Sequence, residues 1–121
     1  MIYTGYYAKI KKYKEFGIEP IAISGKVPDF YNGLTYPDFA PRYSAFQMWK
    51  DEEITNEKYI ELYRTHLDTV IKGIIRTDFE PYSKEGKDCV LLCYEKSGDF
   101  CHRHILADWL RENFGFEVRE F

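Results

Sequence analysis

The strongest constraint on the fold is a short, almost continuous apolar run late in the chain. Residues 89–94 have the sequence CVLLCY, with a glycine shortly before them and a polar stretch directly after them. A run of this length is typical of a strand that is buried on both faces of a parallel sheet. Strands alternating with helices over the rest of the chain would then give an α/β fold.

The other elements follow from hydrophobic periodicity and from the positions of glycine and proline. We predict a single α/β domain over residues 1–121, with a small, mainly parallel, Rossmann-like sheet flanked by helices. Residues 74–83 are ambiguous, and a short helical turn broken by Pro81 is one interpretation of them. The expected strands are residues 2–7, 20–24, 89–94 and 116–121, and the expected helices are residues 8–16, 43–50, 56–72 and 101–114.

One long segment, residues 26–42, fits no regular element. It contains three prolines, one glycine and several aromatic residues. We interpret it as an ordered, aromatic-rich loop, and loops of this length in small domains usually have a function.

The composition excludes several classes of protein. A content of 45% hydrophobic and 18% aromatic residues in 121 residues indicates one folded domain rather than a disordered chain. The net charge of -3 argues against nucleic acid as the main partner, and the lysines between residues 9 and 14 fit a solvated helix face. No stretch resembles a signal peptide or a membrane span, so no membrane partner is expected. Three cysteines, an odd number, favour free thiols in a reducing compartment, and we expect a cytoplasmic protein.

The reactive side chains follow the apolar strand. Cys93 lies at the end of this strand, and Cys101, His102 and Arg103 lie in the first turn of the last expected helix. A helix N-terminus attracts anions and favours a thiolate, so Cys101, His102 and Cys93 are candidate catalytic residues. In the alternative, Cys101 and His102 only pack and cap the helix, with Asp99 as N-cap, and Cys93 is a small core residue.

In open α/β sheets, ligands bind beyond the carboxyl ends of the strands. Lys26 and Arg103 would bring positive charge to that edge, so we expect a phosphorylated or nucleotide-like small molecule there. Tyr36 is expected to stack on or cover this ligand together with Tyr31. The residues predicted to bind it are Arg103, Lys26, Glu95, Ser24, Gly25, Thr4, Tyr6 and Tyr31.

Familiar motifs are missing from the chain. It has no Cys-x5-Arg phosphatase loop, no Walker or GxGxxG loop, and no motif that supports a Ser-His-Asp triad. Zinc ligation by Cys89, Cys93, Cys101 and His102 or His104 is conceivable. However, the chain has no Cys-x2-Cys pair, and Cys89 and Cys93 are too far apart along a strand to hold one ion. We therefore expect neither a metal nor a cofactor.

The segment LLCYEKSGDFCHRHILADWL resembles the family called domain of unknown function 488 (DUF488). The family pattern is an apolar strand, Leu-Cys-x-Glu, a short loop, and Cys-His-Arg at the start of a helix. The segments IYTGYYAKI and ISGKVPDFYNGLTYPDFAPRYSAFQMWK are similar to a compact subgroup, so the resemblance covers most of the chain. The matching positions of the motif are Leu92, Cys93, Glu95, Cys101, His102, Arg103, Leu106 and Ala107.

The resemblance implies a small Rossmann-like domain from a bacterium or a phage. More common family members carry an arginine in the segment after the second strand, where this chain has SGKVPDFY, so Lys26 would replace that arginine. Three functions stay open: an enzyme with Cys101 or Cys93 as nucleophile, a non-catalytic nucleotide sensor or sponge in host–phage conflict, and a protein-interaction module that uses the aromatic loop. A homodimer also stays open.

Overall fold

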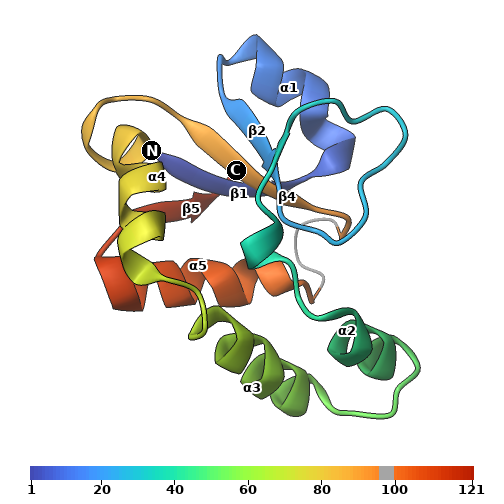
Figure 1. Ribbon diagram of the computed structural model, residues 1–121. Coiled ribbons are helices and arrows are strands. Elements are labelled where there is room, and N and C mark those ends of the chain that lie inside the picture. Colours follow the sequence, from blue (N-terminus) through green and yellow to red (C-terminus); the bar gives the residue numbers. More distant parts are fainter. Residues whose placement is uncertain (96–99) are drawn as a thin grey trace.

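The sheet has five strands in the order β3-β2-β4-β1-β5, and each pairing among the described residues is parallel (Figure 1). A computed structural model describes residues 1–95 and 100–121. The prediction of an α/β fold with a mainly parallel sheet is thus confirmed. The strands are β1 (Ile2–Tyr6), β2 (Glu19–Ala22), β3 (Leu34–Thr35), β4 (Cys89–Cys93) and β5 (Val118–Glu120).

Strand β4 lies at the centre of the sheet, between β1 and β2. All five of its residues are buried, as the apolar run predicted. Because successive side chains of a strand point to opposite faces, Leu91 packs with Ile2 and Ile21 on one face, and Val90 and Leu92 pack on the other. Burial on both faces explains why this strand lacks the polar alternation of an exposed one.

The helices divide between the two faces of the sheet (Figure 1). The face that bears Leu91 is covered by α5 (His102–Phe114) and α4 (Lys72–Lys84), and α3 (Asn56–Leu67) packs against α5. Helix α2 (Tyr43–Lys50) packs in turn against α3, farther from the sheet. The opposite face is covered by a 3-10 turn (Tyr7–Lys9) and α1 (Ile10–Glu15). None of the helices in the described part of the chain has the length and apolar character needed to cross a membrane.

Two predicted boundaries were wrong. The expected helix of residues 56–72 ends at Leu67, and the expected short turn is the 13-residue helix α4, with Pro81 inside it. Ile75 and Phe79 of α4 are 0% and 1% exposed, so the burial of this apolar stripe outweighs the cost of an internal proline. The aromatic-rich loop also contains short regular pieces, namely β3 and a 3-10 turn at Pro37–Phe39.

Gly5 in β1 provides space for an aromatic ring. A Cβ atom at this position would lie 2.3 Å from Tyr13 Oη and 3.0 Å from Val90 Cγ2. The backbone N–H of Tyr6 donates to the same hydroxyl at 3.1 Å, so the Tyr13 ring cannot move away without breaking this bond. The glycine therefore serves packing within the domain.

We expect Gly5→Ala to lower the free energy of unfolding by about 1–3 kcal/mol, because the added methyl overpacks the core. Urea denaturation followed by circular dichroism measures this loss. Gly25→Ala is the matched control, since an added Cβ there meets nothing within 4 Å and should change stability by less than about 0.5 kcal/mol. Equal losses for the two variants would contradict the packing argument.

Candidate functional site

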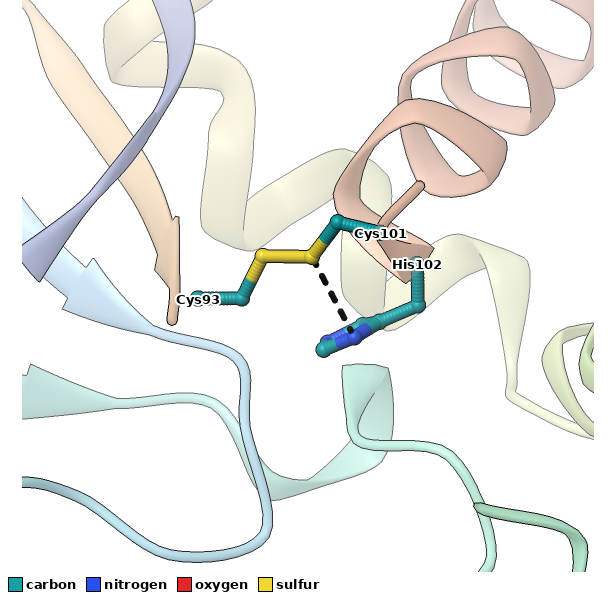
Figure 2. A group of neighbouring side chains, drawn as sticks. All are labelled: Cys93, Cys101 and His102. Carbon is teal, nitrogen blue, oxygen red and sulfur yellow. Dashed lines mark hydrogen bonds between the residues drawn. A yellow bond between two sulfur atoms is a disulfide. The ribbon is translucent and has the colours of Figure 1, made fainter. Parts of the chain in front are cut away.

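The carboxyl end of β4 faces the N-terminus of α5. Cys93 is the last residue of β4, Cys101 is the N-cap residue of α5, and His102 is the first residue of this helix. The three side chains converge, and a disulfide joins Cys93 to Cys101 (Figure 2). Their exposed fractions are 1%, 3% and 6%. We call these three residues the Cys–His corner.

The disulfide corrects the prediction of free thiols. Only Cys89 is free among the described cysteines, and it is buried at the amino end of β4. Burial raises the pKa of the Cys89 thiol, which keeps it protonated and unreactive. The other two cysteines are eight residues apart in the chain, and their approach depends on how α5 packs under the sheet. Asp99, the alternative N-cap, lies outside the described residues.

His102 is held in one orientation by the backbone. Its Nε2 lies 2.8 Å from the carbonyl oxygen of Ile23, directly after β2. A carbonyl can only accept, so Nε2 carries the hydrogen. Burial, aided by the positive charge of Arg103, lowers the pKa of His102 to about 4, and the ring is neutral at pH 7. Its Nδ1 therefore keeps a lone pair, and the Nδ1 atom lies 3.9 Å from Cys101 Sγ (Figure 2).

Arg103 is 0% exposed and makes several internal contacts. Its Nε and Nη2 donate to the two carboxylate oxygens of Glu120, at 3.1 Å and 2.9 Å. Its Nη1 donates to Cys93 Sγ at 3.1 Å and to the backbone carbonyl of Glu95. These contacts favour a structural role for Arg103, in which it orients Cys93, over the predicted contact with an anionic ligand.

Glu120 is one of the site residues that were not predicted from the sequence. It lies next to Thr4 in the pairing of β5 with β1, and the Thr4 hydroxyl donates to its carboxylate at 2.5 Å. The guanidinium of Arg103 also lies over the Tyr6 ring, 5.7 Å from its centroid. Thr4 and Tyr6, both predicted ligand-binding residues, are thus linked to the corner through Arg103 and Glu120. The sequence predicts a strand over residues 116–121, but it could not indicate the register that pairs Glu120 with Thr4.

Other predicted ligand-binding residues have their own contacts. The Ser24 hydroxyl bonds to that of Tyr7, while Gly25 and Lys26 are exposed. Tyr31 is 9% exposed and donates to the carbonyl of Pro20 at 3.2 Å, inside the core beneath α1. Tyr36 donates to Asp78 at 2.7 Å and packs on the opposite face. These contacts favour packing roles for both tyrosines.

A pocket of ≈ 510 Å³ lies beside the corner, between α2, the start of α3 and the end of β4. A second, far smaller space of ≈ 10 Å³ lies at Cys101 and His102, and is also lined by Tyr59 and Phe100. Phe46, Trp49 and Glu95 line both spaces, so the two spaces are neighbours that share a wall. Of the residues that line the larger pocket, only Glu95 was predicted to bind a ligand. The pocket residues are Phe46, Trp49, Lys50, Glu52, Ile54, Thr55, Asn56 and Glu95.

Comparison with known proteins supports the family resemblance. A search of curated proteins found no match, and a search of solved structures found none either. The model of the family DUF488-N3a, described as the active DUF488-N3 subclade, matches residues 19–114. This span includes the Cys–His corner and the whole pocket. The chain therefore belongs to the DUF488 family, within its DUF488-N3a group.

Proposed function

We propose that the chain binds a phosphorylated or nucleotide-like small molecule in the pocket beside α2 and α3, with the Cys–His corner as its reaction centre. The observation that carries this proposal is that Phe46, Trp49 and Glu95 line both the pocket and the small space at Cys101 and His102. A ligand held in the pocket would lie against the wall behind which these two side chains are found. Pocket volumes of about 300–1,000 Å³ are usual for small-molecule sites, and this pocket lies in that range.

The pocket lining supports a ligand with an aromatic part and an anionic part. Phe46 and Trp49 form an aromatic wall against which a base can stack. Lys50, whose ammonium lies 5.8 Å from the Phe46 ring centroid, brings positive charge to the same wall. Thr55 and Asn56 place the N-terminus of α3 in the lining, and unpaired N–H groups at a helix start favour an anion.

Two carboxylates complete the lining. Glu52 and Glu95 accept hydrogen bonds but repel anions, so they favour hydroxyl or amino groups of the ligand. A nucleotide or sugar phosphate carries both kinds of group. This mixed lining favours a ligand with both an anionic group and hydroxyl or amino groups over a simple phosphate ion.

The reaction centre requires reduced cysteines, because a disulfide has no thiolate to attack a substrate or to bind a proton. In the reduced protein, Cys101 lines the small space and has the Nδ1 lone pair of His102 beside it. Cys93 has the guanidinium of Arg103 against its sulfur, and a neighbouring positive charge stabilises a thiolate. These contacts are the basis for proposing catalysis as well as binding.

Isothermal titration calorimetry of the reduced protein with a panel of nucleotides and sugar phosphates tests the binding step. Trp49→Ala and Lys50→Gln should each weaken binding by about tenfold or more, the equivalent of about 1.4 kcal/mol. Lys14→Gln, on exposed α1 far from the pocket, is the control and should leave the affinity unchanged. A panel without any binder, or a binder insensitive to both pocket variants, would overturn the proposed site.

The same titration then separates an enzyme from a binding protein. Cys101→Ser should keep the dissociation constant of the binder and abolish its conversion, as followed by mass spectrometry, whereas Cys89→Ser should preserve both. If the reduced wild-type protein binds the compound without converting it, the proposal of an enzyme is wrong, and the result supports a non-catalytic sensor or sponge.

A further inference from the structure

The three side chains of the Cys–His corner each bring one possible metal-ligand atom to the same small region. Cys93 Sγ, Cys101 Sγ and a ring nitrogen of His102 all lie within 4.8 Å of one another (Figure 2). Thiolate and imidazole are the preferred ligands of Zn²⁺. We propose that the reduced Cys–His corner binds one zinc ion through Cys93, Cys101 and His102, with a fourth position open toward the pocket.

The orientation of His102 supports this set of ligands. Its Nε2–H donates to the carbonyl of Ile23, so the lone pair of Nδ1 points at the sulfurs and is available to a metal. A zinc-bound histidine usually donates its other ring N–H to a carbonyl or carboxylate, which fixes both tautomer and ring orientation. Ile23 supplies that support here. His102 is also almost fully buried, and the described contacts give Nδ1 only the Cys101 sulfur as a neighbouring polar atom.

The backbone positions of the two cysteines fit shared coordination. Their Cα atoms are 7.4 Å apart, beyond the range of about 4.4–6.8 Å that most disulfides span. A tetrahedral ion with Zn–S bonds of about 2.3 Å holds its two sulfurs about 3.8 Å apart, so it bridges a wider gap than a direct S–S bond does. Opening the disulfide therefore lets the sulfurs separate around a metal while the backbone of β4 and α5 stays in place.

Charge and outer contacts are also suitable. Two thiolates neutralise the ion, and the neutral imidazole adds no charge. Arg103 Nη1 donates to Cys93 Sγ at 3.1 Å, and such a hydrogen bond supports a coordinated thiolate from outside the ligand shell. The ion pair with Glu120 fixes the orientation of the Arg103 guanidinium. Among the described contacts, Arg103 donates no hydrogen bond to Cys101 or His102, so the lone pairs of these two ligands stay available to the metal.

Three protein ligands with a fourth position left open are typical of catalytic zinc rather than of structural zinc. The space of ≈ 10 Å³ that is lined by Cys101 and His102 has room for about one water molecule at this position. Only the catalytic role of the ion rests on the proposed function: in that role, water or substrate bound to zinc would be the reacting species. Zinc binding itself needs no pocket ligand.

The change from disulfide to zinc site balances as two steps. A phosphine reductant takes one oxygen atom from water and supplies two electrons, which breaks the S–S bond and gives two thiols and a phosphine oxide. Zinc then replaces the two thiol protons, which pass to the buffer, and forms two Zn–S bonds and one Zn–N bond. The oxidised corner has no thiolate and is expected to bind no zinc.

The test uses the whole protein, reduced with a phosphine and freed of excess reductant under nitrogen. Zinc content by plasma mass spectrometry should be about one ion per chain after gel filtration with Zn²⁺, and close to zero for the oxidised protein. Co²⁺ in place of zinc should give the thiolate-to-cobalt charge-transfer band and the strong visible bands of a tetrahedral S₂N site. Cys93→Ser, Cys101→Ser and His102→Asn should each weaken zinc binding by more than about 100-fold in competition with a chromophoric chelator.

Cys89→Ser is the matched control, since it removes a buried thiol from the opposite end of the same strand and should leave stoichiometry and affinity unchanged. If a ligand variant does not fold, the cobalt spectrum of the wild-type protein still decides the matter. A reduced wild-type protein without zinc, a cobalt spectrum without thiolate bands, or an equal loss in Cys89→Ser would overturn the metal site.

The failure of one proposal can be distinguished from the failure of the other. Trp49→Ala should lose the pocket ligand and keep zinc. A zinc-free protein that still converts its ligand would leave the proposed function intact, with the thiols as the direct reactants.

Discussion

Replacing Arg103 with methionine is expected to lower the free energy of unfolding by about 3 kcal/mol, as measured by urea denaturation. The side chain is 0% exposed and makes a two-pronged ion pair with Glu120, whose side chain is 28% exposed. Methionine has a similar length but removes the guanidinium from this carboxylate, and removal of one member of a buried pair costs about 3–5 kcal/mol. The partial exposure of Glu120 places the expected loss at the lower end.

Arg64 provides a matched control for this prediction. It makes the same two-pronged contact with Glu112, at 2.8 Å and 3.2 Å, but the two side chains are 33% and 59% exposed. We expect Arg64→Met to cost no more than about 1 kcal/mol, because water solvates the carboxylate that is left behind. Similar losses for the two variants would show that burial does not govern the Arg103 pair. Adding Glu120→Gln to Arg103→Met should cost less than the sum of the single changes, since both remove the same interaction.

Trp109→Ala should lower the free energy of unfolding by about 3–5 kcal/mol, the other large loss that we expect. Trp109 is the largest of the fully buried side chains among the described residues, and it is 1% exposed. Its ring meets Phe114 edge-on with centroids 5.6 Å apart, and its Nε1–H donates to Asp68 at 2.9 Å. Alanine would leave a cavity between α5 and the end of α3, and Asp68 would lose its donor.

Two further variants separate the parts of this loss. Trp109→Phe keeps most of the apolar volume and removes the hydrogen bond to Asp68, so it should cost less than half as much. Trp49→Ala truncates a tryptophan that is only half-buried in the pocket wall, and it should affect ligand binding more than stability. Thermal and urea unfolding of the three variants check the order, and a loss for Trp49→Ala as large as that for Trp109→Ala would contradict the assignment of Trp109 to the core.

The class of fold could be predicted because the apolar run of β4 and the alternation of strands with helices are local properties of the sequence. The details that failed depend on tertiary contacts. Pro81 suggested an interrupted segment, yet the burial of Ile75 and Phe79 maintains α4 through it. Strand β3 has only two residues, both exposed, and it exists because it pairs with Ile21 and Ala22. No pattern within Leu34–Thr35 could indicate that pairing.

The residues of the candidate site also fall into those that local sequence patterns predict and those that depend on tertiary contacts. Cys93, Cys101, His102 and Arg103 could be found from the sequence, because a strand end and a helix start have recognisable signals. Their partners could not, since the register of β5 places Glu120 beside Thr4 and the packing of α2 on α3 forms the pocket. The expectation of no metal depended on the absence of a Cys-x2-Cys pair and on the spacing of Cys89 and Cys93 along one strand. The smaller group of Cys93, Cys101 and His102 needs no Cys89, and the packing of α5 against β4 brings it together.

The strand order has a consequence for how the protein forms during synthesis. β1 and β2 both pair with β4 and do not pair with each other, and β4 follows them in the chain by more than sixty residues. A nascent chain that ends before Cys89 therefore has no central strand on which the first two can assemble. Since domains generally fold as units, the sheet must close late, after β4 leaves the ribosome. The Cys–His corner can form only after this step, because Cys101 and His102 follow β4 in the chain and α5 must pack against the sheet.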